Sequence, residues 1–286
     1  MSVDTFTPEI WSLKLLSSLK KSLVYAQPSI VNRDYEGEIS EKGDTVHINS
    51  VGRPTIATYV KGVTTIVPEQ LSTAQRSLVI DQSKYFAFEV DDIDKRQNAG
   101  NVIPEAMTEA AYGLRDLADM VVASLYVGAQ AANVIAGPIV ILGTAAEAIK
   151  AYELVLVPLK ILLDNANVPT EGRYAVVPPW FHGRLLLDSR FVKVNESGTE
   201  TGLRNGQVGR AAGFDILVSN NTPNPAASQA VVQVGVPNAI SFAEQINKTE
   251  AYRPQDSFSD AVKGLHLYGT KLIRPDSIAY AVTSPV

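Results

Sequence analysis

Hydrophobic and polar positions alternate in two stretches near the start of the chain, which predicts a pair of β-strands. The outgoing arm covers residues 45–49 and 55–60, and the returning arm covers 77–81 and 85–90. Both arms are rich in β-branched and aromatic residues, which is typical of strands. A polar, turn-rich segment joins them. Because an isolated hairpin is marginally stable in water, we consider two interpretations: strands within an ordinary sheet, or an extension that lies across another subunit.

The residues before Pro28 have the pattern of an amphipathic helix. The start at Thr7-Pro8-Glu9 combines a hydroxyl cap, a proline at the first helical position and an acid in the first turn. Apolar residues then recur every four positions, at Trp11, Leu15, Leu19 and Leu23. Three roles fit this pattern: packing on the subunit's own core, docking on a partner or an inner surface, and membrane association.

The longest helical pattern begins near residue 103. Its apolar residues follow alternating four- and three-residue steps and form one stripe: Ile103, Met107, Ala110, Leu114, Leu117 and Val121. We expect this helix to reach about Ala136, a length of about 50 Å at 1.5 Å per residue. A buried strand at 139–142 is expected to follow. Although Met120–Ala146 carries no charge, Gly137-Pro138 interrupts it, so we do not expect a transmembrane helix.

The remainder of the chain alternates shorter elements. A helix is predicted over 145–164, with a kink or break at Pro158 because proline removes a helical hydrogen-bond donor. A second helix is predicted over 180–191, and 197–213 is predicted to be a loop or hairpin. Apolar runs predict strands at 173–177, 214–218, 230–234, 264–273 and 278–282.

Composition narrows the function classes. The chain has 286 residues, a net charge of −5 and no long run of basic residues, which argues against a dedicated nucleic-acid-binding protein. It has no cysteine, which excludes disulfides, thiolate metal sites and a cysteine nucleophile. The first residues lack the pattern of a signal peptide.

No motif of a known catalytic or phosphate-binding site is present. The acidic run Asp91-Asp92-Ile93-Asp94 lacks the spacing of a calcium loop, and we expect it to cap the next helix. The histidines, His47, His182 and His266, are far apart in sequence, and we expect structural roles for them. We therefore predict no catalytic residue, no cofactor and no metal site.

The order of these elements resembles that of tailed-bacteriophage major capsid proteins of the Hong Kong 97 fold. Several short stretches are similar to that family as well: Gly43–Val46, Phe88–Asp92, Gly172–Pro179, Gly206–Arg210 and Val262–Gly269. The resemblance covers nearly the whole chain and implies an α+β fold. It implies an N-terminal arm at 1–34, an extended β-hairpin loop at 45–82 and an axial domain at 139–254. A peripheral domain with the long spine helix would comprise 83–138 and 255–286.

The resemblance also implies the partners. We expect copies of the chain to form pentamers and hexamers of an icosahedral shell that encloses double-stranded DNA without sequence-specific binding. Because the arm helix starts within ten residues of Met1, we expect a separate scaffolding protein, together with a portal and no membrane contact. Assembly would occur in the bacterial host cytoplasm, and the product would be part of the virion. Our candidate intersubunit contacts are Trp11, Leu15, Leu19, Lys61, Val63, Ile66, Val67 and Leu71.

Two other functions remain open from the sequence. A cellular nanocompartment shell would share the fold but would contain a protein cargo instead of nucleic acid. A soluble enzyme with an unrecognised site would behave as a small compact oligomer.

Overall fold

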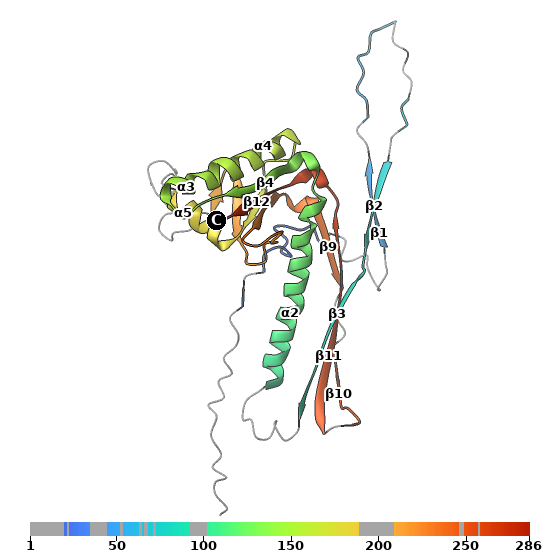
Figure 1. The fold of residues 1–286 in the computed structure, drawn as a ribbon. Helices are drawn as coiled ribbons and strands as arrows, with labels where there is room; N and C mark the ends of the chain where they lie inside the picture. The colour runs from blue at the N-terminus through green and yellow to red at the C-terminus, as the bar shows by residue number, and fades with distance from the viewer. Residues whose placement is uncertain are drawn as a thin grey trace, which may run out of the picture.

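The computed structural model describes residues 20–21, 23–34, 45–51, 54–62, 65, 68–70, 73–91, 102–188, 209–245, 249–256 and 258–286. The strands within these ranges form three sheets of two, four and six strands. In Figure 1 the six-stranded sheet with its helices, the long helix α2 and the two-stranded β1–β2 ribbon are three distinct regions of the molecule.

The six-stranded sheet has the order β4-β12-β8-β5-β7-β6. Its strands are β4 (Val134–Val140), β5 (Tyr174–Val177), β6 (Arg210–Ala211), β7 (Phe214–Val218), β8 (Ala230–Gly235) and β12 (Ile278–Ser284). The strands predicted at 173–177, 214–218, 230–234 and 278–282 are thus confirmed. At the end of the predicted segment 197–213, β6 pairs with β7 in a hairpin that turns through Ala212 and Gly213, both with positive φ; residues 197–208 of this segment lie outside the described residues.

Helices α3 (Ala145–Lys150), α4 (Val157–Asn165) and α5 (Pro179–Leu187) lie beside this sheet (Figure 1). Leu159 and Leu163 of α4 and Phe181 of α5 are fully buried in one cluster with apolar residues of the strands. A π-helical segment, Ala151–Leu156, separates α3 from α4. Pro158 lies in the first turn of α4, and the backbone stays helical where the π-helical segment joins α4, so the predicted break at Pro158 is not observed.

The four-stranded sheet is built on the long strand β11 (Ser259–Leu272). One edge of β11 pairs with β3 (Gln82–Asp91), and the other pairs with β10 (Thr249–Tyr252) and then β9 (Ile240–Gln245). Helix α2 runs along this sheet (Figure 1). β10 and β9 have no counterpart in the sequence predictions. The predicted strand 264–273 is confirmed as part of β11.

The predicted ribbon is confirmed in its central part only. β1 (Thr45–Val51) and β2 (Thr73–Val79) form an antiparallel hairpin with Thr45 opposite Val79 and Val51 opposite Thr73. The prediction that 55–60 continues the outgoing strand is wrong, because these residues form no strand. The prediction that 85–90 belongs to the returning arm is also wrong, because β3 pairs with β11 along its whole length. Pairing within the larger sheet outweighs the local pattern.

The long helix is shorter than predicted. α2 spans Val102–Ser124, which corresponds to about 35 Å at 1.5 Å per residue. Two 3₁₀ turns follow it, and residues 134–140 form β4 rather than the helix end and separate strand that we expected. β4 pairs in parallel with β12, and this sheet pairing defines the conformation of a segment whose sequence is compatible with a helix. Val140 and Leu142 are largely exposed, so the prediction that 139–142 is wholly buried is wrong.

The buried face of α2 also differs from the predicted stripe. Leu114, Ala118 and Val122 are buried at four-residue spacing, whereas Leu117 is 41% exposed. The helix therefore packs with a face rotated slightly from the stripe that the sequence suggests. The alanine at 118 is small, so α2 can lie close to its neighbours along this face. A hydrophobic pattern favours large apolar residues and therefore does not identify a face that contains a small one.

Residues 20–21 and 23–27 form turns and irregular structure, so the predicted N-terminal helix does not extend through them. Its first part, residues 1–19, lies outside the described residues. The division into arm, loop, peripheral and axial domains stays a prediction. In the observed pairing, β9 and β10 join β11, whereas β12 joins the six-stranded sheet.

Candidate intersubunit surfaces

The outer part of the ribbon exposes apolar side chains. Ile56 is 89% exposed and Tyr59 is 62% exposed, beyond the last paired residues of β1 and β2. The two arms remain linked there, because the Thr55 N–H donates a hydrogen bond of 2.9 Å to the Glu69 carboxylate. Figure 1 shows this part of the chain projecting far beyond the sheets. The ribbon thus presents an uncovered apolar surface at a distance from the subunit core.

Of the candidate contacts predicted on the ribbon, Lys61 is described and lies exposed in a turn with Gly62. The other four lie outside the described residues: Val63, Ile66, Val67 and Leu71. The predicted contacts of the arm, Trp11, Leu15 and Leu19, lie outside them too.

The base of the ribbon is fixed to the subunit. Leu78 and Ile80 are fully buried in a small cluster with Val46 and with Ala243 of β9. Gly269 of β11 lies directly beneath, where a Cβ atom would be 2.4 Å from the Val79 carbonyl oxygen. The ribbon is therefore an anchored extension, with a packed base and an uncovered tip.

The N-terminal segment 20–34 packs along α2. The Lys20 ammonium pairs with Glu109 at 3.2 Å, and the Lys21 ammonium pairs with Asp116 at 2.9 Å. The Lys21 N–H also donates a 2.9 Å hydrogen bond to the Tyr112 hydroxyl. These contacts are partly exposed, so each ion pair contributes little by itself. Together they define the path of the segment.

The second half of this segment belongs to the core of the subunit. Val24, Tyr25, Ile30 and Val31 are almost completely buried, in one cluster with residues of α2, β9 and β11. Asn32 exchanges backbone hydrogen bonds with β9. Of the range 1–34 that was assigned to an arm, the residues from Val24 onwards thus have a structural role within their own subunit.

A buried carboxylate holds this segment against α2. The Asp119 carboxylate accepts hydrogen bonds from the Ala26 N–H at 3.0 Å and from the Asn221 amide at 2.8 Å. The same Asn221 amide donates to Asp116 at 2.8 Å. Burial raises the pKa of Asp119 above its ordinary value, although these hydrogen bonds oppose the shift. The cluster joins the N-terminal segment, α2 and the loop after β7.

A second polar cluster joins the segment to β9 and β11. The Glu244 carboxylate pairs with Arg33 at 2.8 Å and with the largely buried His266 at 3.1 Å. The hydrogen bond from His266, helped by Arg33, lowers the pKa of Glu244 to about 2. The Arg33 guanidinium also lies over the Phe242 ring, 4.9 Å from its centroid. Sequence analysis did not identify Arg33, Glu244 or Asp119, because their partners are far away in the chain.

The face of the four-stranded sheet turned away from α2 is open. Tyr85 and Leu265 are directly opposite each other in the β3–β11 register, and Tyr85 is 79% exposed. Two residues away on β11, Lys263 pairs with Glu250 of β10 at 3.0 Å and lies over the Tyr252 ring of β10. On the opposite face, Phe86 occupies the space above Gly264. The open face therefore offers aromatic groups beside an ion pair.

The described residues contain no group of three or more His, Asp or Glu side chains that could hold a metal ion. None of the helices in the described ranges is long and apolar enough to cross a membrane. The three histidines lie on separate elements, on β1, α5 and β11. The acidic run after β3 lies outside the described residues beyond Asp91, so the expected helix cap stays a prediction.

Comparison with known proteins identifies the family. A family model described as phage capsid protein matches residues 75–281. A chain from Mycobacterium phage Che8 is 32% identical, with a TM-score of 0.79, over 99% of this chain and 98% of its own length. The capsid structure of Cyanophage P-SCSP1u is 19% identical, with a TM-score of 0.74, over 96% of this chain and 92% of its own. At that identity it supports the fold alone. No curated protein matches.

The family model covers most of the chain, and the Che8 chain is similar over almost all of it. The resemblance seen in the sequence is therefore confirmed, as is the mixed α+β fold. An extended ribbon, an anchored N-terminal segment and open apolar surfaces are what a subunit that assembles with its own copies requires. The chain belongs to the phage capsid protein family and is a major capsid protein that forms the shell of the phage head.

Proposed function

We propose that the chain forms pentamers and hexamers that close into an icosahedral shell around double-stranded DNA, and that the ribbon joins neighbouring subunits. The observation that supports the ribbon's role is the exposure of Ile56 and Tyr59 on an extension whose base is packed. Full burial of such a side chain contributes about 1.5–3 kcal/mol. The isolated subunit lacks this stabilisation because both side chains are exposed. In the shell, each copy would gain it when a second subunit covers them.

The ribbon can be shortened without changing its base. We would replace residues 52–72 with Asn-Gly, so that Val51 and Thr73, already opposite each other, are joined by a tight two-residue turn. The isolated subunit should keep its circular dichroism spectrum and thermal stability, because the buried cluster at the base is retained. Sedimentation should show monomers or capsomers instead of closed shells.

A point variant provides a matched test of the same proposal. Ile56→Ser with Tyr59→Ser removes the apolar groups and keeps the loop length, whereas Thr58→Ala changes a polar, exposed position between them. The double variant should require a higher subunit concentration for assembly, and the control should assemble like wild type. Closed shells of normal size from both the shortened ribbon and the double variant would contradict the proposed contact.

The charge of the chain supports the proposed contents of the shell. A net charge of −5 with scattered basic residues suits a container that holds DNA without sequence-specific contacts. We propose further that a separate scaffolding protein and a portal take part, that assembly occurs in the host cytoplasm, and that the subunit has no catalytic role. Nuclease-protected DNA inside purified virions, with no sequence preference, is the expected observation. A defined protein cargo in place of DNA would contradict it.

A further inference from the structure

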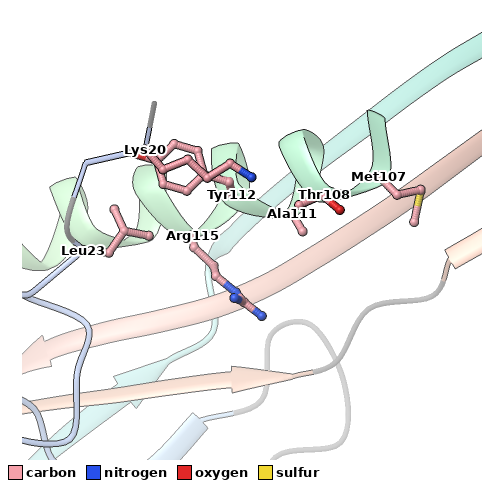
Figure 2. Close-up of a pocket in the computed structure, with 7 residues that line it drawn as sticks. All are labelled: Lys20, Leu23, Met107, Thr108, Ala111, Tyr112 and Arg115. Carbon is pink, nitrogen blue, oxygen red and sulfur yellow. The ribbon is translucent and has the colours of Figure 1, made fainter. Parts of the chain in front are cut away.

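An open groove lies between the N-terminal segment and α2. Lys20 and Leu23 form one side, and Met107, Ala111 and Tyr112 line the helix side (Figure 2). Its cavity volume is about 370 Å³, at the lower end of the range of ligand pockets. The helix side combines an exposed alanine with a half-buried methionine and tyrosine. Thr108 and Arg115 complete the lining of the helix side, and the apolar surface between these polar groups suits aliphatic side chains.

The segment and the helix run in the same direction. Lys20 pairs with Glu109 near the beginning of α2, and Ala26 donates to Asp119 further along the helix. Followed backwards from Lys20, the chain therefore leads toward the end of α2 where Met107 lies. Consecutive Cα atoms are about 3.8 Å apart, so Leu19 must lie next to Lys20 and thus beside the groove.

The residues that precede Lys20 indicate what fills the groove. Leu23 already lines it. Because residues 20–21 and 23–27 form no helix, the continuity of the chain through Lys20, and not the four-residue spacing, brings Leu19 to the groove. In the predicted helix, Leu16 lies three residues before Leu19 and therefore on the same side. We propose that the groove on α2 binds Leu16 and Leu19 of the same chain, against Met107 and Ala111.

The length of α2 limits how much of the N-terminal segment can bind there. Only residues 102–108 of the helix precede Glu109, which is about 10 Å at 1.5 Å per residue. A helix from Thr7 to Leu19 would span about 20 Å. With that helix, Trp11 would lie beyond the groove and would be available to a second copy. The groove is an anchor that determines where the arm leaves its subunit.

This inference deepens the intersubunit contact that the sequence predicts for Trp11. It rests on the proposed shell only for Trp11, because the anchoring of Leu19 concerns a single chain. Deletion of residues 1–11 removes Trp11 and tests that contact separately: it should reduce shell formation while Leu19 still contacts the groove. Normal shells from this deletion would contradict the Trp11 contact and leave the anchor standing, whereas absence of the Leu19 contact in the full-length protein would contradict the anchor.

Photocrosslinking in the full-length protein tests the occupant of the groove. We would place p-benzoylphenylalanine at position 19 or 16 and assemble shells from an equal mixture of ¹⁵N-labelled and unlabelled subunits. Crosslinks should join this segment to the tryptic peptide 97–115, and both peptides of each pair should carry the same label. Pairs with mixed labels would show that a second copy fills the groove. Crosslinks to other parts of the chain would show that the groove does not bind this segment.

A blocked groove provides an independent test. Ala111→Glu places a charge on the floor of the groove, and Met120→Glu places one at an exposed position of α2 outside it. In unassembled subunits, trypsin should cleave after Lys14 about tenfold faster in Ala111→Glu, which corresponds to about 1.4 kcal/mol of lost binding. The control should be cleaved like wild type. Equal cleavage rates in all three proteins, with unchanged circular dichroism, would overturn the proposal.

Discussion

Gly269 allows the base of the ribbon to approach β11, and its replacement by alanine should displace the ribbon. The added Cβ would lie 2.4 Å from the Val79 carbonyl oxygen and 2.8 Å from Ile80 Cδ1, whereas real Cβ contacts stay above 3.0 Å. To lengthen this contact from 2.4 Å to the 3.0 Å limit, the backbone of Val79 must move by at least 0.6 Å (3.0 minus 2.4). This neighbour is backbone within a packed cluster, so no side-chain rotation can relieve the contact.

Overpacking of this kind costs about 1–3 kcal/mol. Since 1 kcal/mol corresponds to roughly 2–4 °C in domains of 150–250 residues, the melting temperature of unassembled Gly269→Ala should fall by about 2–12 °C. A displacement of the ribbon base should also move the ribbon tip, which we propose contacts a neighbouring subunit. The yield of assembled shells should therefore fall by more than the loss of subunit stability accounts for.

Gly113→Ala provides the matched control for this change. Gly113 is an exposed position inside α2, and a Cβ there would meet nothing within 4 Å. Alanine in a helix interior is favoured over glycine by about 0.5–1 kcal/mol, so this variant should be slightly more stable than wild type. We would compare both by calorimetry and by electron microscopy of the assembled particles. A Gly269→Ala protein with wild-type stability would refute the close approach that we infer.

Two further predictions concern the core and the charged clusters. Leu114→Ala should lower the free energy of unfolding of the unassembled subunit by about 2–4 kcal/mol. Leu117→Ala should lower it by less than about 1 kcal/mol because Leu117 is 41% exposed. Equal losses for the two variants in urea denaturation would mean that α2 packs differently. Because the pKa of Glu244 is lowered to about 2 in the folded state by His266 and Arg33, its contribution to stability is fully present above the ordinary pKa of about 4.3 and is lost as the pH falls toward 2. Unfolding measured between pH 2 and 5 should therefore depend less on pH in Glu244→Gln than in wild type, and parallel curves would contradict this assignment.

Local patterns predicted the elements whose stability depends on nearby residues. A helix over 145–164 was predicted from its apolar spacing, and residues 145–165 are helical throughout, with Pro158 in the first turn of α4, where its missing N–H costs least. The strands β5 and β8 were predicted because nearly every residue in them is apolar, as expected for strands buried on both faces. The β1–β2 hairpin was predicted from its alternation.

The errors share one physical cause, which is competition between local preference and pairing at long range. Residues 134–136 can continue a helix, but parallel pairing with β12 places them in a strand. Residues 85–90 suit a hairpin arm as well as a sheet strand, and β11, far away in sequence, provides their partner. Leu117 fitted the predicted stripe, whereas the packed helix buries Ala118 and Leu114 instead.

The sequence by itself determined the kind of protein: an acidic, cysteine-free α+β chain without a catalytic motif, with a hairpin, a long helix and an order of elements similar to phage capsid proteins. These properties depend on composition, periodicity and order, which can be read along the chain. Only the tertiary structure decided where α2 ends, which sheet each strand joins, and how Asp119 and Glu244 fasten residues 20–34 to the subunit. Those features depend on contacts between residues about 90 to more than 200 positions apart, and no local pattern specifies a partner at that distance.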